Sequence, residues 1–292
     1  MRDENPCVDG SIPSPGTISS SPDSNFNKMS DPCKTVTHQF EFHSPQGLLS
    51  FALKLPDAEI SLPDFCRALF DAWPAVNDFL EENRRGGPPV SCRKGCGACC
   101  RQLVTISPAE AFLLERLFTA MPPERAERIT DRFQDGRAEL ERAGILARLK
   151  QLNNPETSNE EHHGIAAQYF RLAIACPFLE DESCGIYESR PWICREYAVT
   201  SPARNCADPF GNSVHVANPP VQFSEALKLL CAHLLGTEID HIPILLALDW
   251  IKRNSRALQS TWPAEKLISL FLQYVELTAP TEERDGQPED CS

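Results

Sequence analysis

The part of this sequence with the clearest chemical meaning is a tight cluster of cysteines. A stretch of nine residues carries four thiols, at Cys92, Cys96, Cys99 and Cys100. Crowded thiolates repel one another unless a positive ion lies among them, so this spacing predicts metal ligation. Gly95 and Gly97 favour the same interpretation, because glycine permits the positive φ angles and close approaches that ligand turns need.

A second group of four cysteines follows some eighty residues later, at Cys176, Cys184, Cys194 and Cys206. Gly, Pro and acidic residues interrupt the intervals between them, which predicts turns that let these thiols converge. Eight cysteines in two groups of four could fill two four-coordinate sites, or one polynuclear site with bridging sulfurs. The sequence favours neither. We expect the metal to be zinc or iron, with an iron–sulfur cluster as one form of the latter.

Composition and charge narrow the class of protein. The start of the chain has no apolar run that could act as a signal peptide, and no stretch of about eighteen uncharged apolar residues occurs anywhere. The net charge of −13 disfavours binding to nucleic acid, which is also negatively charged. We therefore expect a soluble cytoplasmic protein that binds neither nucleic acid nor membrane. In a reducing compartment, dense cysteine favours metal binding over disulfides, and the thirteen cysteines could not all pair within one chain.

The cysteine motifs, taken in order, resemble a known family. Residues 92–101 and the segments Cys176-Pro-Phe-Leu, Cys184-Gly-Ile-Tyr, Arg190-Pro and Cys194-Arg-Glu-Tyr look like those of YkgJ-like cysteine cluster proteins, the CxxCxxCC zinc- or iron-chelating domain family. The resemblance covers about residues 88–210 and implies metal binding by these cysteines, but no particular reaction. The family pattern has two residues between its first cysteines, whereas three separate Cys92 from Cys96, so the resemblance supports Cys92 least.

Two other functions would use the same cysteines. Cys92, Cys96 and Cys99 have the three-then-two spacing of radical S-adenosylmethionine enzymes, and the flagellin lysine N-methylase family carries a similar cluster. Such an iron–sulfur enzyme needs a partial α/β barrel, and no series of strand–helix units follows the cysteines. A thiol redox sensor, whose cysteines oxidise and release metal, is the third hypothesis. The sequence does not show whether the chain is an enzyme or which protein partner it has.

Several residues near the cysteines have both a functional and a structural interpretation. The cations Lys94, Arg190 and Arg195 could offset the charge of thiolates around a metal, and Tyr187 could donate to a sulfur. Alternatively, the cations are solvated and Tyr187 belongs to the core. His162 and His163 are candidate nitrogen ligands, but a histidine pair at the edge of a loop is more simply a polar surface. We leave both pairs of alternatives open.

The elements that position these residues are expected to be mainly helical. We predict one irregular helical domain over residues 35–280, with a cysteine-rich metal-binding loop core at 88–210. The Ser- and Pro-rich arm 1–34 and the tail 281–292 should lack fixed structure. The cysteines in these arms are expected to be bystanders: Cys7, Cys33 and Cys291.

Local patterns predict the individual elements. Alternation at 38–43 and an apolar run at 48–55 favour a short N-terminal β-hairpin, and a helical period spans 62–83. Ser107-Pro-Ala-Glu110 is typical of a capped helix start, which accounts for Glu110 by capping alone. We expect that helix to reach Thr119, a second to span 122–150, an exposed loop at 153–161, and helices beyond Cys206. Cys66 and Cys231 lie on apolar helical faces, which predicts burial.

Overall fold

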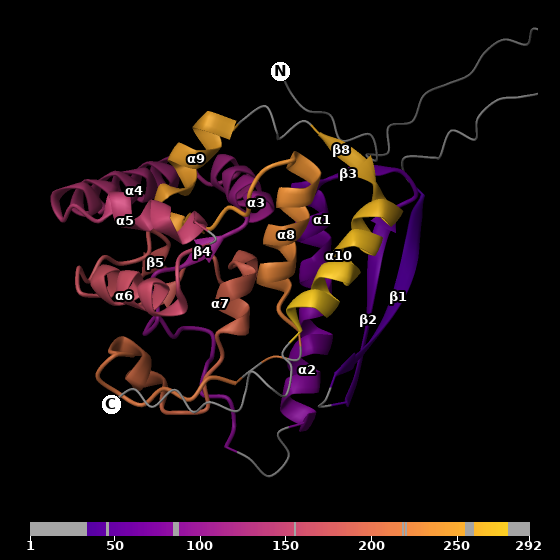
Figure 1. The fold of residues 1–292 in the computed structure, drawn as a ribbon, viewed down its shortest axis with the longest axis horizontal. Coiled ribbons are helices and arrows are strands. Elements are labelled where there is room, and N and C mark those ends of the chain that lie inside the picture. Colours follow the sequence, from indigo (N-terminus) through magenta and orange to yellow (C-terminus); the bar gives the residue numbers. More distant parts are fainter. Residues whose placement is uncertain are drawn as a thin grey trace, which may run out of the picture.

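The structure is a computed structural model that describes residues 34–44, 47–83, 88–154, 156–217, 219, 221–254 and 260–279. These residues are mainly α-helical, and each sheet they form is a two-stranded antiparallel pair (Figure 1). The predicted mainly α class is confirmed, together with its N-terminal hairpin. Among the described residues, no helix is both long and apolar enough to cross a bilayer. The predicted arms fall almost wholly outside the described residues, as do Cys7, Cys33 and Cys291.

A β-hairpin forms one wall of the molecule. Strand β1 (Thr35–Ser44) pairs with β2 (Gly47–Pro56) in antiparallel register. Alternate residues of β2 are buried, as expected for a sheet with one face on the core and one in solvent. Phe40 lies opposite Phe51 with 5.2 Å between ring centroids, so the inner face begins an apolar cluster.

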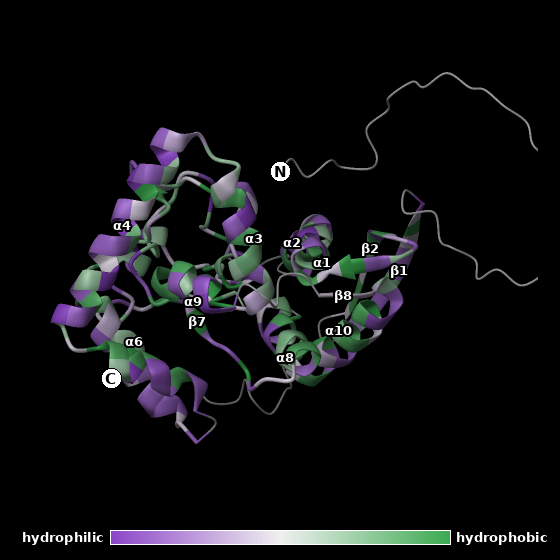
Figure 2. Ribbon diagram, turned by 90° about the horizontal axis from the view of Figure 1, so that it is seen from above, coloured by the Kyte–Doolittle hydropathy of each residue, from purple (hydrophilic) through white to green (hydrophobic). Residues whose placement is uncertain are grey.

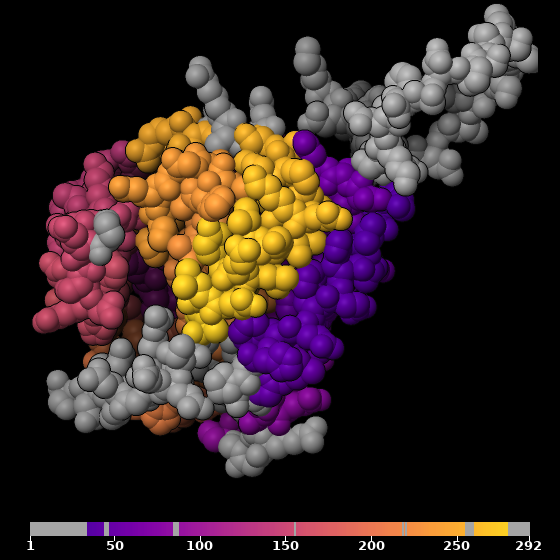
Figure 3. Space-filling view, turned by 45° about the vertical axis from the view of Figure 1, so that its right-hand side comes forward, coloured from indigo at the N-terminus to yellow at the C-terminus, as the bar shows by residue number. Residues whose placement is uncertain are grey.

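Helices cover the inner face of the hairpin and complete the first apolar cluster. They are α1 (Leu62–Leu69), the 3₁₀ turn η1 (Phe70–Ala72), α2 (Trp73–Asn83), α8 (Phe223–Leu235) and α10 (Ala264–Thr278). The short strands β3 (Glu59–Ser61) and β8 (Thr261–Pro263) pair beside them. Phe271 meets the rings of Phe65 and Phe223 at 5.6 and 5.2 Å. The space-filling view shows α10 packed directly against α8 and the hairpin (Figure 3).

The other half of the fold is built around a second and a third apolar cluster. Its elements are β4 (Thr105–Ile106), α3 (Pro108–Thr119), α4 (Pro123–Arg142), α5 (Leu146–Leu149), η2 (Lys150–Asn153), α6 (Asn159–Phe170), β7 (Ile242–Pro243), η5 (Ile244–Leu246) and α9 (Ala247–Asn254). Figure 2 shows the contrast between α4, which is largely hydrophilic, and α8, which is largely hydrophobic. Helix α3 joins the halves, because Ala109 belongs to the first cluster and Phe112 to the second.

Two predicted boundaries are wrong for identifiable reasons. The helix expected over 122–150 stops at Arg142, because the chain turns at Gly144 with a φ of +68° before α5 begins. The loop expected over 153–161 instead leads into α6. Ser158 caps this helix, and the Glu161 carboxylate accepts a hydrogen bond from the Ser158 amide. His162 and His163 therefore lie on a helix, not on a loop.

Candidate metal centre

The first cysteine group lies on a chain of tight turns. The amide of Cys96 donates to the Arg93 carbonyl at 3.2 Å, and the amide of Cys100 donates to that of Gly97 at 3.0 Å. Gly95 has a φ of +91°, which confirms that a glycine supplies a positive φ angle in this loop. Consecutive turns point neighbouring side chains in different directions, so the four thiols do not share one helical face.

The second group begins around a two-residue turn. Strands β5 (Leu179–Glu180) and β6 (Ser183–Cys184) pair across Asp181 and Glu182, whose φ angles are +50° and +55°. Two positive φ angles are typical of the hairpin turn that matches the strand twist, although glycine or asparagine usually supplies them. The turn places Cys176 just before the hairpin and Cys184 at its end.

Helix α4 holds this hairpin through two arginines. Arg132 donates to the carbonyls of Pro177 and Leu179 at 3.2 and 3.0 Å. Arg125 donates to the Glu180 carboxylate at 2.6 Å and to the Gly185 carbonyl at 2.8 Å. The backbone on both sides of the hairpin is thereby fixed to a long helix, which positions Cys176 and Cys184 against the second apolar cluster.

The remaining cysteines of the second group lie on short helices. Cys194 is on α7 (Trp192–Glu196), which follows the turn η3 (Tyr187–Ser189), and Cys206 is on η4 (Ala203–Ala207). A five-residue helix has little stability of its own, so tertiary contacts must hold α7 in place.

Buried polar side chains provide those contacts. Glu110 accepts from the Trp192 amide at 2.7 Å while it also caps α3 through Ser107. Glu196 accepts from the amide and hydroxyl of Ser224 on α8. Arg195 donates to the carbonyls at positions 188 and 190. The role of Glu110 beyond capping was not predicted, because its partner lies 82 residues away.

The two cysteine segments are joined directly. The Cys176 amide donates to the Cys100 carbonyl at 2.7 Å, and Arg101 binds the Glu182 carboxylate at 2.7 and 3.0 Å. A Cβ on Gly97 would lie 2.5 Å from the Glu182 carbonyl oxygen, so the absence of a side chain permits this contact. Residues 92–100 therefore lie beside the second group, as predicted.

Electrostatic interactions among the thiols show how the two groups meet. The pKa of Cys99 is raised by a hydrogen bond with Cys100 and by burial. Burial also raises the pKa of Cys176 to about 12 and that of Cys206 to about 11, and the nearby Cys99 contributes to both shifts. The pKa of Cys194 is raised mainly by burial, and its neighbours Cys176, Cys99 and Cys184 raise it further. Cys99 is thus close to members of both groups.

The cations named from the sequence occupy different positions. Lys94 forms an exposed ion pair with Glu188 at 2.7 Å. Arg195 is buried, with its guanidinium carbon 4.3 Å from the Phe70 ring centroid. Arg190 lies over the Tyr187 ring at 4.1 Å, and its charge opposes the burial that raises the pKa of Cys92, Cys99 and Cys184. The ring of Tyr187 therefore contacts a guanidinium.

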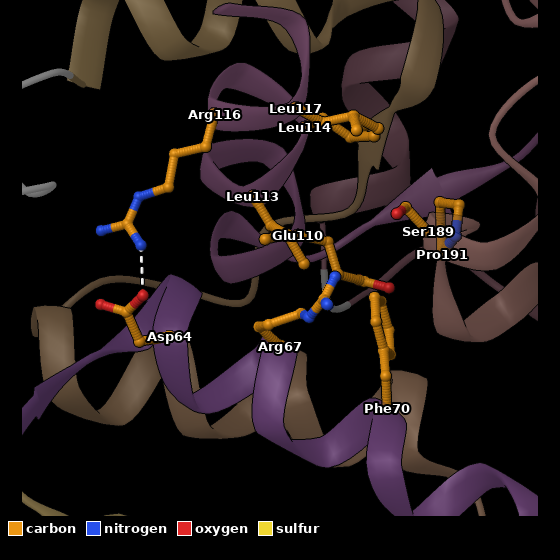
Figure 4. Close-up of a pocket in the computed structure, with 10 residues that line it drawn as sticks. All are labelled: Asp64, Arg67, Phe70, Glu110, Leu113, Leu114, Arg116, Leu117, Ser189 and Pro191. Atoms are coloured by element: carbon orange, nitrogen blue, oxygen red, sulfur yellow. Dashed lines mark hydrogen bonds and ion pairs between the residues drawn. The ribbon is translucent and has the colours of Figure 1, made fainter. Parts of the chain in front are cut away.

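The cavities near the site differ in whether they reach a cysteine. A cavity of about 650 Å³ is lined in part by Cys176, and another of about 370 Å³ by Cys184. A third, of about 300 Å³, lies between α1, α3 and the residues that precede α7, with Glu110 and Pro191 on its walls (Figure 4). No cysteine lines that third cavity.

The donor set fits a thiolate metal site, although the sulfurs are not yet arranged as ligands. Every cysteine in the described ranges is a free thiol, and Cys66 and Cys231 are buried in the first apolar cluster, as predicted. Within the same ranges, no three His, Cys, Asp or Glu side chains are positioned to hold a metal ion. The sulfurs would therefore have to move from these positions in order to ligate a metal.

The candidate histidines lie apart from this chemistry. The ring of His162 is 6.5 Å from that of His241, and the ring of His163 packs against Phe210. No interaction of either His162 or His163 with a cysteine is found in the described part of the chain. The structure therefore gives no support to these two side chains as nitrogen ligands.

Comparison with known proteins bears on the cysteine region. Residues 91–213 match the family model CxxCxxCC, whose description is "Putative zinc- or iron-chelating domain". The cysteine region is therefore similar to this family. The match confirms the resemblance found from the cysteine motifs, and it indicates zinc or iron chelation by the CxxCxxCC segment. No curated protein and no solved structure matches the chain.

Proposed function

We propose that this chain binds zinc or iron through eight cysteine thiolates that form one joint centre. The candidate ligands are Cys92, Cys96, Cys99, Cys100, Cys176, Cys184, Cys194 and Cys206. The observation that carries the proposal is the position of Cys99, whose thiol interacts with members of both groups while Cys100 and Cys176 share a backbone hydrogen bond. Clustered thiols with raised pKa values favour a site that a cation completes, because the cation stabilises the thiolate form.

The electrostatic neighbours divide seven of the eight candidate ligands into two sets that share Cys99. Cys206 interacts with Cys92, Cys96 and Cys99, and Cys92 interacts with Cys96 and Cys99. Cys176, Cys184 and Cys194 interact with one another and also with Cys99. This pattern favours a polynuclear centre in which a sulfur bridges two metals over two separate four-coordinate sites. Thiolate ligation also agrees with the cytoplasmic location that we propose, since a reducing compartment keeps cysteines available.

Elemental analysis of the full chain, purified without oxygen, tests the proposal. We expect metal in thiolate coordination: a colourless protein if zinc is bound, and visible absorption if an iron–sulfur cluster is present. Cys99→Ser should lower the metal content more than Cys92→Ser, because only Cys99 interacts with both sets. Cys231→Ser is the matched control, and it should keep its metal while losing about 1–3 kcal/mol of stability. Wild-type protein that is folded, metal-free and unable to take up zinc or iron would refute the proposal.

The two alternative functions receive different support. All sheets in the described residues are two-stranded, so they contain no partial α/β barrel on which a radical S-adenosylmethionine enzyme would be built. The redox sensor uses the same thiols, and its mark would be metal release by a stoichiometric oxidant with recovery on reduction. That titration on the loaded protein separates a sensor from a permanent metal site.

A further inference from the structure

The side chain of Arg190 is placed unlike the other cations of the cysteine region. It lies between Cys184 and Cys194, directly before α7, and its guanidinium packs over the ring of Tyr187. Its Nε is buried and has no hydrogen-bond partner among the described residues. Buried N–H groups are nearly always paired in native proteins, so a donor of this kind points to an acceptor that comes into place only when the site is occupied.

Three neighbouring cations have partners already. Lys94 binds Glu188, Arg101 binds Glu182, and Arg195 donates to two backbone carbonyls. Each of these cations therefore already binds a protein group near the cysteines. Arg190 differs because its Nε–H has no such partner in the described ranges, while its charge acts on cysteines of both groups.

The proposed centre needs a compensating charge of this kind. Eight thiolates around two divalent ions leave about four uncompensated negative charges in a half-buried site. Groups that donate to metal-bound sulfurs stabilise such thiolates and tune the metal. A guanidinium suits this role because it stays charged when it is partly buried and is only weakly hydrated. The Tyr187 ring beneath it adds a cation–π contact that fixes its plane.

We propose that Arg190 is the counter-charge of the metal centre, with its Nε–H donating to a metal-bound cysteine sulfur. This inference rests on the proposed metal binding and deepens it by naming the positioning residue that holds the thiolates in their charged form. Arg190 is not a ligand. Its removal should weaken metal binding without emptying the donor set, which separates it from the eight cysteines.

The test compares two substitutions of Arg190 with a matched control in the full chain. Arg190→Gln removes the charge, and Arg190→Lys keeps a charge but loses the donor at the Nε position. Arg116→Gln is the control, because Arg116 is an ion-paired arginine bound to Asp64 on α1, and both residues line the cavity that no cysteine lines. The readouts are zinc affinity by competition with a chelator, the sulfur-to-cobalt absorption of the Co²⁺ form, and the unfolding midpoint of the metal-free protein.

We expect Arg190→Gln to bind zinc about 10–100-fold more weakly than wild type and Arg190→Lys to lie between the two. The cobalt absorption of Arg190→Gln should move to longer wavelength, because a sulfur that loses a hydrogen bond gives up electron density more easily. Arg116→Gln should have the zinc affinity and cobalt absorption of wild type, and the unfolding midpoints of all the metal-free variants should equal that of metal-free wild type.

A zinc affinity of Arg190→Gln within twofold of wild type would overturn the inference about Arg190 but would not contradict the metal centre. A lowered metal-free midpoint in both Arg190 variants would instead assign Arg190 a structural role, and wild type without metal uptake would refute both proposals.

Discussion

The residues that carry the candidate chemistry are held in place by uncharged backbone groups as much as by charges. Cys92 shows this clearly, because its sulfur accepts from the Val199 amide at 3.4 Å while the adjacent Ser91 amide donates to the Val199 carbonyl at 2.8 Å. This fixes the beginning of the first cysteine loop against residues that follow α7. The extra residue between Cys92 and Cys96, relative to the family pattern, therefore does not detach Cys92 from the other thiols.

A histidine outside the metal centre gives the protein a defined response to acid. Burial and the positive charge of Lys228 lower the pKa of His241 from 6.5 to about 4. The unfolded chain takes up a proton near pH 6.5 and the folded chain only near pH 4, so stability present above pH 6.5 is lost as the pH falls through this window. We expect the free energy of unfolding to drop between pH 7 and pH 5, with about 1–2 kcal/mol of the loss due to this partly exposed ring.

His241→Gln isolates this contribution. The free energy of unfolding is measured by urea denaturation at pH 7 and at pH 5. Its decrease between these pH values should be about 1–2 kcal/mol smaller in His241→Gln than in wild type. The difference between the two proteins cancels other titrating groups, including the cysteines. Equal losses in both proteins would contradict the assignment.

Single residues were predictable from the sequence where the cause is local. Gly95 and Gly97 together were expected to permit positive φ angles and close approaches, and the structure has a positive φ at Gly95 and a close approach at Gly97. The second function of Glu110 was not predictable, because the sequence holds the capping signal but no sign of Trp192 as a partner. Nor did the sequence distinguish Arg190, with its buried Nε, from the solvent-exposed Lys94.

At the scale of elements, local signals were again the reliable ones. The capping box at Ser107 predicted α3 correctly, and the same signal at Ser158 and Glu161 would have found α6. The apolar period of α6 is weak, because its first turns are polar and its buried face consists of Ile165 and Tyr169. The arrangement of turns around the first four cysteines could not be predicted from the sequence, because it depends on contacts with β5 and β6 some eighty residues further along the chain.

The contact between the first cysteine loop and the β5–β6 turn is the element-scale feature most open to test. Gly97→Ala would bring a Cβ to 2.5 Å from the Glu182 carbonyl oxygen and 2.6 Å from Leu179, so the two segments must separate. We expect a loss of about 1–3 kcal/mol in the free energy of unfolding, as for other overpacked sites, together with weaker zinc binding. Chemical denaturation and chelator competition measure the two effects.

The matched control is Gly164→Ala within α6, where the nearest atom to the new Cβ is 3.8 Å away. Alanine favours helix over glycine, so this variant should gain about 0.5–1 kcal/mol and bind zinc as wild type does. If Gly97→Ala matched this control in both measurements, the close contact between the loops would be ruled out as a determinant of the site.

For the whole molecule, the cysteine region lies where separate apolar clusters come together. Trp192 of α7 is buried in the first cluster with Phe223, at 4.8 Å between ring centroids. Cys176 and Cys184 pack against the second cluster. We propose that residues 35–280 form one domain, because α3 and α7 each contact both sides of this boundary. The first cluster nevertheless contains none of the eight candidate ligands, so we expect most of its packing to survive loss of the metal.

This distribution predicts how the protein responds to loss of metal. Bound metal stabilises the folded state by mass action, and at a hundredfold excess over the dissociation constant this amounts to about 2.7 kcal/mol. For a protein of this size we expect chelation to lower the unfolding midpoint by roughly 5–10 °C. Helical circular dichroism at 25 °C should persist, because the apolar clusters remain, and amide exchange should accelerate in residues 91–102 and 176–206 but not in α8 or α10. Loss of all helical signal on chelation would show instead that metal is needed for the core to form, as in a zinc finger. An unchanged midpoint would show that no stabilising metal had been bound.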